Sequence, residues 1–118
     1  MDDEPMNEQA ADARRPMDIA MAVLADRDRR RVLVSLLDTG PQSRSAPLHL
    51  QDLRQSDEEA ETFEIRMCHV HLPKLADTGY VEWDKDTNEI RDGPRFDDLR
   101  PLLRILVENG DELPGDVI

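Results

Sequence analysis

The chain has 118 residues, the length of one domain, and its single cysteine excludes an intrachain disulfide. Its longest apolar run covers only seven residues, Ile19–Ala25, so the sequence predicts neither a membrane-spanning helix nor a signal peptide, and we expect a protein of the reducing cytoplasm. The 27 acidic residues outnumber the 15 basic ones, and the net charge of −12 excludes the strongly basic class of nucleic-acid-binding proteins.

The first part of the chain is predicted to hold a tail and two helices. Residues 1–16 are polar and acidic without helical periodicity, which is typical of a disordered tail. Apolar residues then recur with a helical period over Met17–Ala25 and again over Arg27–Leu37. Asp26 is placed to accept from the free amides at the start of the second helix, and Gly40 fits its C-terminal stop.

A short helix and a long helix are predicted next. The short one covers Leu48–Gln55, and the long one covers Asp57–Thr78, between a capping box at Ser56-x-x-Glu59 and a stop at Gly79. At 100° per residue, one face of the long helix gathers the side chains that should meet the core: Ile65, Cys68, Leu72, Leu75 and Ala76. The opposite face carries an outward apolar stripe: Phe63, Met67 and Val70.

The last part of the chain is predicted to form a β-hairpin and a helix. Apolar and acidic residues alternate in Tyr80–Asp84, and Glu89–Asp92 forms the return strand after a polar turn. A final helix is expected over Asp97–Asn109, and residues 111–118 are predicted to be a flexible tail, so that the folded domain covers residues 17–110. The final helix carries a broad leucine stripe: Leu99, Leu102, Leu103 and Leu106.

This order of elements is that of a winged helix-turn-helix domain, and two passages resemble a known family. LADRDRRRVLVSLL, from Leu24, and HLPKLADTGYVEWD, from His71, resemble the ArsR-like winged helix-turn-helix proteins, and the latter passage is most similar to small winged-helix proteins of halophilic archaea. The resemblance covers about Met17–Asn109. It implies an α+β fold with a helical core, a two-stranded β-hairpin as the wing, a C-terminal dimerisation helix, and transcriptional regulation as a homodimer.

The acidic composition has two explanations. One is a protein that avoids nucleic acid. The other, which we favour, is adaptation to molar salt, because acid enrichment, only two lysines and few aromatic residues occur together. At 1 M salt the Debye length is about 3 Å, so the negative charge repels DNA far less than it does in dilute buffer.

Eight side chains are candidates for contact with double-stranded DNA. At the start of the second helix, Arg27, Arg30 and Arg31 are candidates for phosphate contacts. The candidates for reading bases lie on the long helix, and Arg91 on the hairpin could reach a minor groove. The five acidic residues of Asp57–Glu64 depart from the usual recognition helix and weaken this prediction. The base-reading candidates are Arg66, His69, His71 and Lys74.

Two apolar surfaces predict protein contacts. The outward stripe of the long helix fits a protein partner better than a DNA groove, so the alternative function is an adaptor that does not read DNA. The leucine stripe of the final helix is wider than one small domain needs, which favours a two-fold homodimer.

Other kinds of site find less support in the sequence. Cys68 and His71 could share a metal ion, which would make the protein a metal- or redox-responsive repressor, but zinc needs four ligands and Cys68 is better explained as a small buried hydrophobe. The acidic residues form no constellation with a nucleophile, and the glycines form no phosphate-binding loop. We therefore expect no enzyme activity, no cofactor and no metal.

Overall fold

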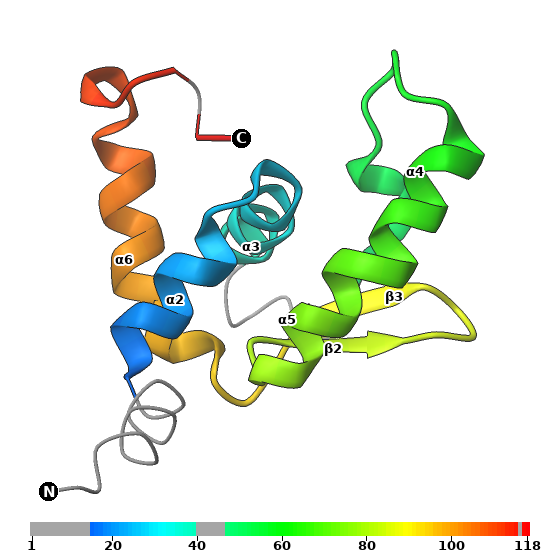
Figure 1. Ribbon diagram of the computed structural model, residues 1–118, viewed down its shortest axis with the longest axis horizontal. Coiled ribbons are helices and arrows are strands. Elements are labelled where there is room, and N and C mark those ends of the chain that lie inside the picture. The colour runs from blue at the N-terminus through cyan, green and yellow to red at the C-terminus, as the bar shows by residue number, and fades with distance from the viewer. Residues whose placement is uncertain (1–14, 40–46, 116) are drawn as a thin grey trace, which may run out of the picture.

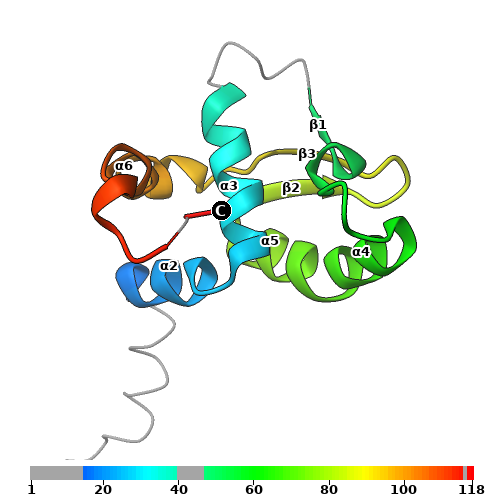
Figure 2. The same ribbon diagram turned by 90° about the horizontal axis from the view of Figure 1, so that it is seen from above.

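The computed structural model of the protein describes residues 15–39, 47–115 and 117–118, and it has an α+β fold (Figure 1). Residues 1–14 of the predicted tail and Gly40 lie outside the described residues. Helix α3 (Arg27–Thr39) occupies the centre, with α2 (Pro16–Leu24) and α6 (Phe96–Glu108) on one side (Figures 1 and 2). On its other side lie α4 (Ala60–Arg66), α5 (Leu72–Thr78) and a three-stranded antiparallel sheet. Within the described ranges, no helix has the length and apolar character needed to cross a membrane.

The first two helices confirm the prediction. Helix α2 covers Pro16–Leu24 and begins at its proline, which suits a first helical turn. Helix α3 covers Arg27–Thr39. The carboxylate of Asp26 accepts from the backbone N–H of Asp28 at 2.8 Å, as expected of an N-cap.

The predicted helix over Leu48–Gln55 is wrong. Its first two residues form strand β1, Leu48–His49, and only Leu50–Leu53 are helical, as a short 3-10 turn. The cause is pairing at long range, because Leu48 lies opposite Ile90 of strand β3 and the Leu50 N–H donates to the Asn88 carbonyl. Edge pairing with a distant strand outweighs the local helical pattern here.

The long helix is confirmed, but it is not regular. It comprises α4, Ala60–Arg66, a π-helical turn over Met67–His71, and α5, Leu72–Thr78. Its N-cap is Glu59 rather than the predicted Ser56, and it ends as predicted at Gly79, whose φ of 86° is left-handed.

The π turn overturns the predicted faces of this helix. Phe63 and Met67, predicted to point outward, are each only 1% exposed, whereas Ile65, predicted to face the core, is 53% exposed. A π turn adds an extra residue, so the residues before it, such as Phe63 and Ile65, and those after it, such as Leu72, do not fit one wheel drawn at 100° per residue. Pro73, which lacks an N–H, lies just after the irregularity. Of the predicted outward stripe, only Val70 is exposed.

The hairpin is confirmed. Strand β2, Val81–Asp84, pairs antiparallel with β3, Glu89–Asp92, and the strand order is β1-β3-β2. Asn88 ends the turn with a φ of 60°, the left-handed conformation that asparagine tolerates.

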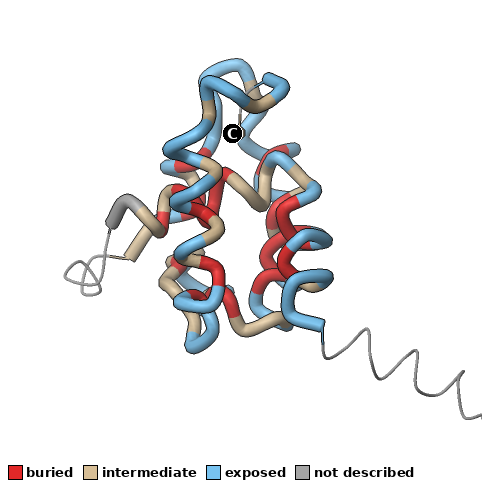
Figure 3. The backbone as a smooth tube through the Cα atoms, turned by 90° about the vertical axis from the view of Figure 1, so that its left-hand side faces the viewer, coloured by how far each residue is buried: buried red, intermediate tan, exposed pale blue. Residues whose placement is uncertain are grey.

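Helix α6, Phe96–Glu108, completes the core. Leu99 and Leu103 are buried within the monomer, so their predicted role in a dimer interface is wrong, while Leu102 and Leu106 are half-buried. Figure 3 shows the buried segments turned toward the middle of the molecule. The segment after α6, predicted as a flexible tail, forms a 3-10 turn over Gly110–Glu112 and returns so that Val117 packs against the core.

Candidate nucleic-acid interface

A cluster of charged side chains joins the start of α3 to the long helix. Arg66 Nε lies 2.7 Å from a carboxylate oxygen of Asp28, and its Nη2 lies 2.8 Å from Glu58. Arg31 Nη1 lies 3.5 Å from Glu58 and 3.8 Å from Asp28, and it also donates to the Leu53 carbonyl. Arg31 is only 6% exposed. Two arginines predicted to contact DNA, buried Arg31 and half-buried Arg66, are therefore paired with two shared carboxylates of the protein.

The ionisation of this cluster follows from its contacts. Burial pushes the pKa of Glu58 upward, but hydrogen bonds from the Gln55 N–H and Arg66, with the charge of Arg31, outweigh it and lower the pKa overall. The hydrogen bond to Asp28 raises the pKa of Arg66. Both changes favour the charged forms of Glu58 and Arg66.

His71 extends the cluster toward α2. The side chain is only 4% exposed, and its Nε2 lies 3.4 Å from Asp28 and 3.5 Å from Asp26. Its Nδ1 lies 3.1 Å from Arg29 Nη1, and Arg29 also donates to the carbonyls of Ala22 and Val23. Because the arginine can only donate, Nδ1 accepts and the ring proton lies on Nε2, facing the two carboxylates.

Lowering the pH should test this arrangement through stability. Burial lowers the pKa of His71 below its ordinary value of 6.5, with the Arg29 and Arg66 charges adding to the effect and Asp26 and Asp28 opposing it. The unfolded chain therefore takes up the proton first, and the free energy of unfolding should fall as pH drops below 6.5 through the folded-state pKa. Protonation of Glu58, whose pKa is lowered from its ordinary value of 4.5, removes further stability only at lower pH.

Urea unfolding at a series of pH values from neutral to mildly acidic measures this slope. The variant His71→Gln should flatten it, whereas His69→Gln, at an exposed position of the same helix, should keep it. If the dependence of stability on pH is unchanged in His71→Gln, then His71 is not its cause.

Asp26, Asp28 and His71 also bring three potential metal-ligand atoms within 4.8 Å of one another. Arg66 already donates to Asp28 and Arg29 already donates to His71, so these arginines supply the positive charge that a metal ion would bring. The predicted partner Cys68 lies elsewhere, with its thiol 3.9 Å from the Asn88 amide oxygen. Burial, followed by the Glu64 charge, raises the pKa of the thiol, which is typical of a structural cysteine.

Arg30 is also turned inward. Its Nη1 donates to the Leu24 carbonyl at 2.7 Å and its Nε donates to the Val117 carbonyl, so it ties the end of α2 to the C-terminal segment. Of the eight predicted DNA contacts, Arg30, Arg31, Arg66 and His71 thus have structural partners. Neither Arg29 nor the acidic partners were predicted as parts of a site, although the spacing of Asp28 and Arg31 permits an ion pair across one helical turn.

Three of the other four candidates lie at the surface. Arg27 on α3 is exposed, as are His69 and Lys74 on the long helix. Arg91 is half-buried in β3, opposite Glu82 of β2. The basic side chains of His69 and Lys74 therefore lie on the outer side of the long helix, close to exposed Val70 and Pro73.

The hairpin lies beside this outer surface. The side-chain amide of Asn88 donates to Glu64 at 3.3 Å, which joins the turn to α4, and β2 packs along α5 (Figure 1). The geometry thus defines a small α+β protein in which one side of a long helix and the tip of a hairpin are presented together.

The chain belongs to the family described as Domain of unknown function (DUF7344), which matches residues 21–91. The match runs from α2 to β3 and includes the charged cluster, while α6 lies outside it. No curated protein and no solved structure matches the chain.

Proposed function

We propose that the protein is a winged-helix DNA-binding protein that regulates transcription as a homodimer. The observation that carries the proposal is the placement of the long helix, which packs on α3 and β2 and, in the described part of the chain, keeps its outer side exposed beside the hairpin. The β1-β3-β2 sheet and the order of elements are compatible with a winged-helix fold, in which such a helix enters the major groove.

The proposed contacts are fewer than the sequence predicts. His69 and Lys74 would reach base edges, Arg27 would hold a phosphate, and Arg91 on the hairpin would approach the neighbouring groove. Glu61 and Glu64 on the exposed side of α4 oppose DNA, so we expect binding only where salt screens them.

The proposed homodimer would use residues that the monomer leaves uncovered. Ile105 and Val107 on α6 and Met17 and Met21 on α2 are exposed large apolar side chains. Burying them against a second copy removes apolar area from water, which is the main driving force for association.

A second candidate function is an adaptor that docks on another protein. It is favoured by Ile65 and Val70, two aliphatic side chains on the long helix that are each 53% exposed. Aliphatic groups fit a hydrophobic partner surface better than a phosphate-lined groove.

A DNA-binding assay on two charge-matched variants separates the candidates. A duplex enriched from a random-sequence library is titrated with protein in molar KCl and followed by fluorescence anisotropy. His69→Gln with Lys74→Gln should weaken binding by about tenfold or more, because two candidate base contacts are lost. Arg104→Gln, at an exposed position of α6, is the control and should bind normally.

The adaptor is tested on the same helix with Ile65→Asp and Val70→Asp. If no duplex is enriched, or if the double variant at 69 and 74 binds as well as the wild type, the DNA proposal fails. A protein partner that is lost only in the two Asp variants would then identify the adaptor.

A further inference from the structure

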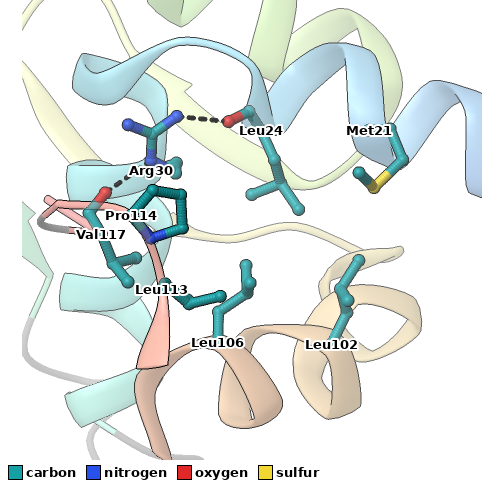
Figure 4. A pocket seen from close by; sticks show the side chains of 8 residues that line it. All are labelled: Met21, Leu24, Arg30, Leu102, Leu106, Leu113, Pro114 and Val117. Atoms are coloured by element: carbon teal, nitrogen blue, oxygen red, sulfur yellow. Dashed lines mark hydrogen bonds between the residues drawn. The ribbon is translucent and has the colours of Figure 1, made fainter. Parts of the chain in front are cut away.

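An apolar pocket of about 310 Å³ lies between α2, α6 and the C-terminal segment (Figure 4). This volume reaches the lower end of the range for small-molecule sites, about 300–1,000 Å³. The side chains of α2 and α6 face one another across the pocket in Figure 4, and the returning segment closes one end. The pocket is lined by Met21, Leu24, Arg30, Leu102, Leu106, Leu113, Pro114 and Val117.

Among the described residues that line the pocket, Arg30 is the one that carries a charge. Two of its N–H groups donate to neutral carbonyls, those of Leu24 and Val117. An arginine carries five N–H donors, so three remain on its terminal nitrogens. Within the described residues Arg30 forms no ion pair, although the chain has 27 acidic residues. Among the described residues, this half-buried guanidinium beside an apolar pocket thus has no acidic partner.

We propose that this pocket binds a small amphipathic carboxylic acid. Its hydrocarbon or aromatic body would lie between α2 and α6, where it removes apolar surface from water. Its carboxylate would accept from the remaining N–H groups of Arg30, since a guanidinium and a carboxylate match in shape and charge.

The charge of the site selects a monoanion. A phosphate ester carries nearly two negative charges and would meet one arginine on a protein of net charge −12. A carboxylate carries one charge, which Arg30 neutralises. A neutral apolar molecule, or an apolar side chain of a second copy, would fill the pocket but leave the arginine without a counter-charge.

This site goes beyond the proposed function and does not depend on it, because ligand binding is measured without DNA. The probe is phenylbutyrate, and its uncharged counterpart phenylbutanol has the same body without the carboxylate. Isothermal titration calorimetry of the full chain in molar KCl should give one site per chain, with phenylbutyrate bound at least about tenfold more tightly than phenylbutanol.

Two variants test the residues. Arg30→Gln should remove the preference for the acid, whereas Arg27→Gln, three residues earlier on α3 and exposed, should keep it. Met21→Trp should block both probes, because the larger side chain fills the pocket from its exposed rim without entering the core. This second variant keeps the test valid if Arg30→Gln fails to fold.

Three results would overturn the proposal. The first is the absence of saturable binding of phenylbutyrate to the wild type. The second is equal affinity for the acid and the alcohol, or a preference for the acid that Arg30→Gln leaves unchanged. The third is a difference in molar mass, measured by light scattering, between the wild type and Met21→Trp, which would make a second copy the occupant.

Discussion

Replacing Gly93 by alanine should lower the free energy of unfolding by about 2–4 kcal/mol. A Cβ at this position would lie 2.4 Å from the Gly79 carbonyl oxygen, 2.8 Å from the Val81 nitrogen and 2.9 Å from the Tyr80 carbonyl carbon. All three are backbone atoms, so no side-chain rotation relieves the overlap. Relief requires that the end of β3 move away from the start of β2.

That movement would break contacts that hold the hairpin to the helices. The Gly93 N–H donates to the Tyr80 carbonyl at 2.9 Å, and the Arg95 N–H donates to the Gly79 carbonyl at 2.8 Å. These bonds fix the chain where α5 ends and where α6 is about to begin. The predicted loss therefore concerns the whole domain and should appear as one cooperative shift.

Urea unfolding followed by circular dichroism in molar KCl measures the loss, and Gly110→Ala is the matched control. Apart from its neighbours along the chain, no described residue has an atom within 4 Å of the Cβ that alanine would add at Gly110, so this variant should differ from the wild type by less than about 0.5 kcal/mol. Equal midpoints for the two variants would contradict the close approach at Gly93.

The hairpin and the helix stop could be predicted because their signals are local. Gly79 takes a left-handed φ after the helix, Asn88 takes one in the turn, and Val81 and Ile90 lie on the buried side of their strands. Each of these features depends on a few neighbouring residues, so the sequence pattern contains the information.

Strand β1 and the faces of the long helix could not be predicted for the opposite reason. Leu48 pairs with Ile90, a residue far along the chain, and the helical pattern around Leu50 gives no sign of it. The π turn at Met67–His71 changes the angle between the residues before it and those after it, and a helical wheel of constant 100° steps does not include this change. One irregular turn was enough to exchange Phe63 and Ile65 between the core and the surface.

The prediction of DNA contacts failed mainly because it treated paired arginines as exposed ones. Helical-wheel reasoning assigns a charged residue to solvent unless a partner lies three or four positions away. Arg66 and Asp28 are separated by 38 positions and meet only because the long helix crosses the start of α3. The three arginines predicted to contact phosphate at the start of α3 were Arg27, Arg30 and Arg31, and two of them, Arg30 and Arg31, bind partners within the protein.

The contrast between Arg31 and Arg27 tests this conclusion directly. Arg31→Met should lower the free energy of unfolding by about 2–3 kcal/mol, because it leaves the carboxylates of Asp28 and Glu58 to share Arg66 alone and removes the hydrogen bond to the Leu53 carbonyl. The side chain of Arg31 is only 8% exposed, so molar salt should screen little of this loss.

Arg27→Met is the matched control, since it makes the same substitution on the same helix at an exposed position. It should change stability by less than about 0.5 kcal/mol, and under the proposed function it should weaken DNA binding. Arg31→Met should affect DNA binding only where it unfolds the protein, because a side chain held between two carboxylates does not reach a phosphate. If Arg31→Met instead leaves the urea midpoint unchanged and abolishes DNA binding, then the arginine leaves its carboxylates for the DNA, and the division between structural and exposed arginines fails.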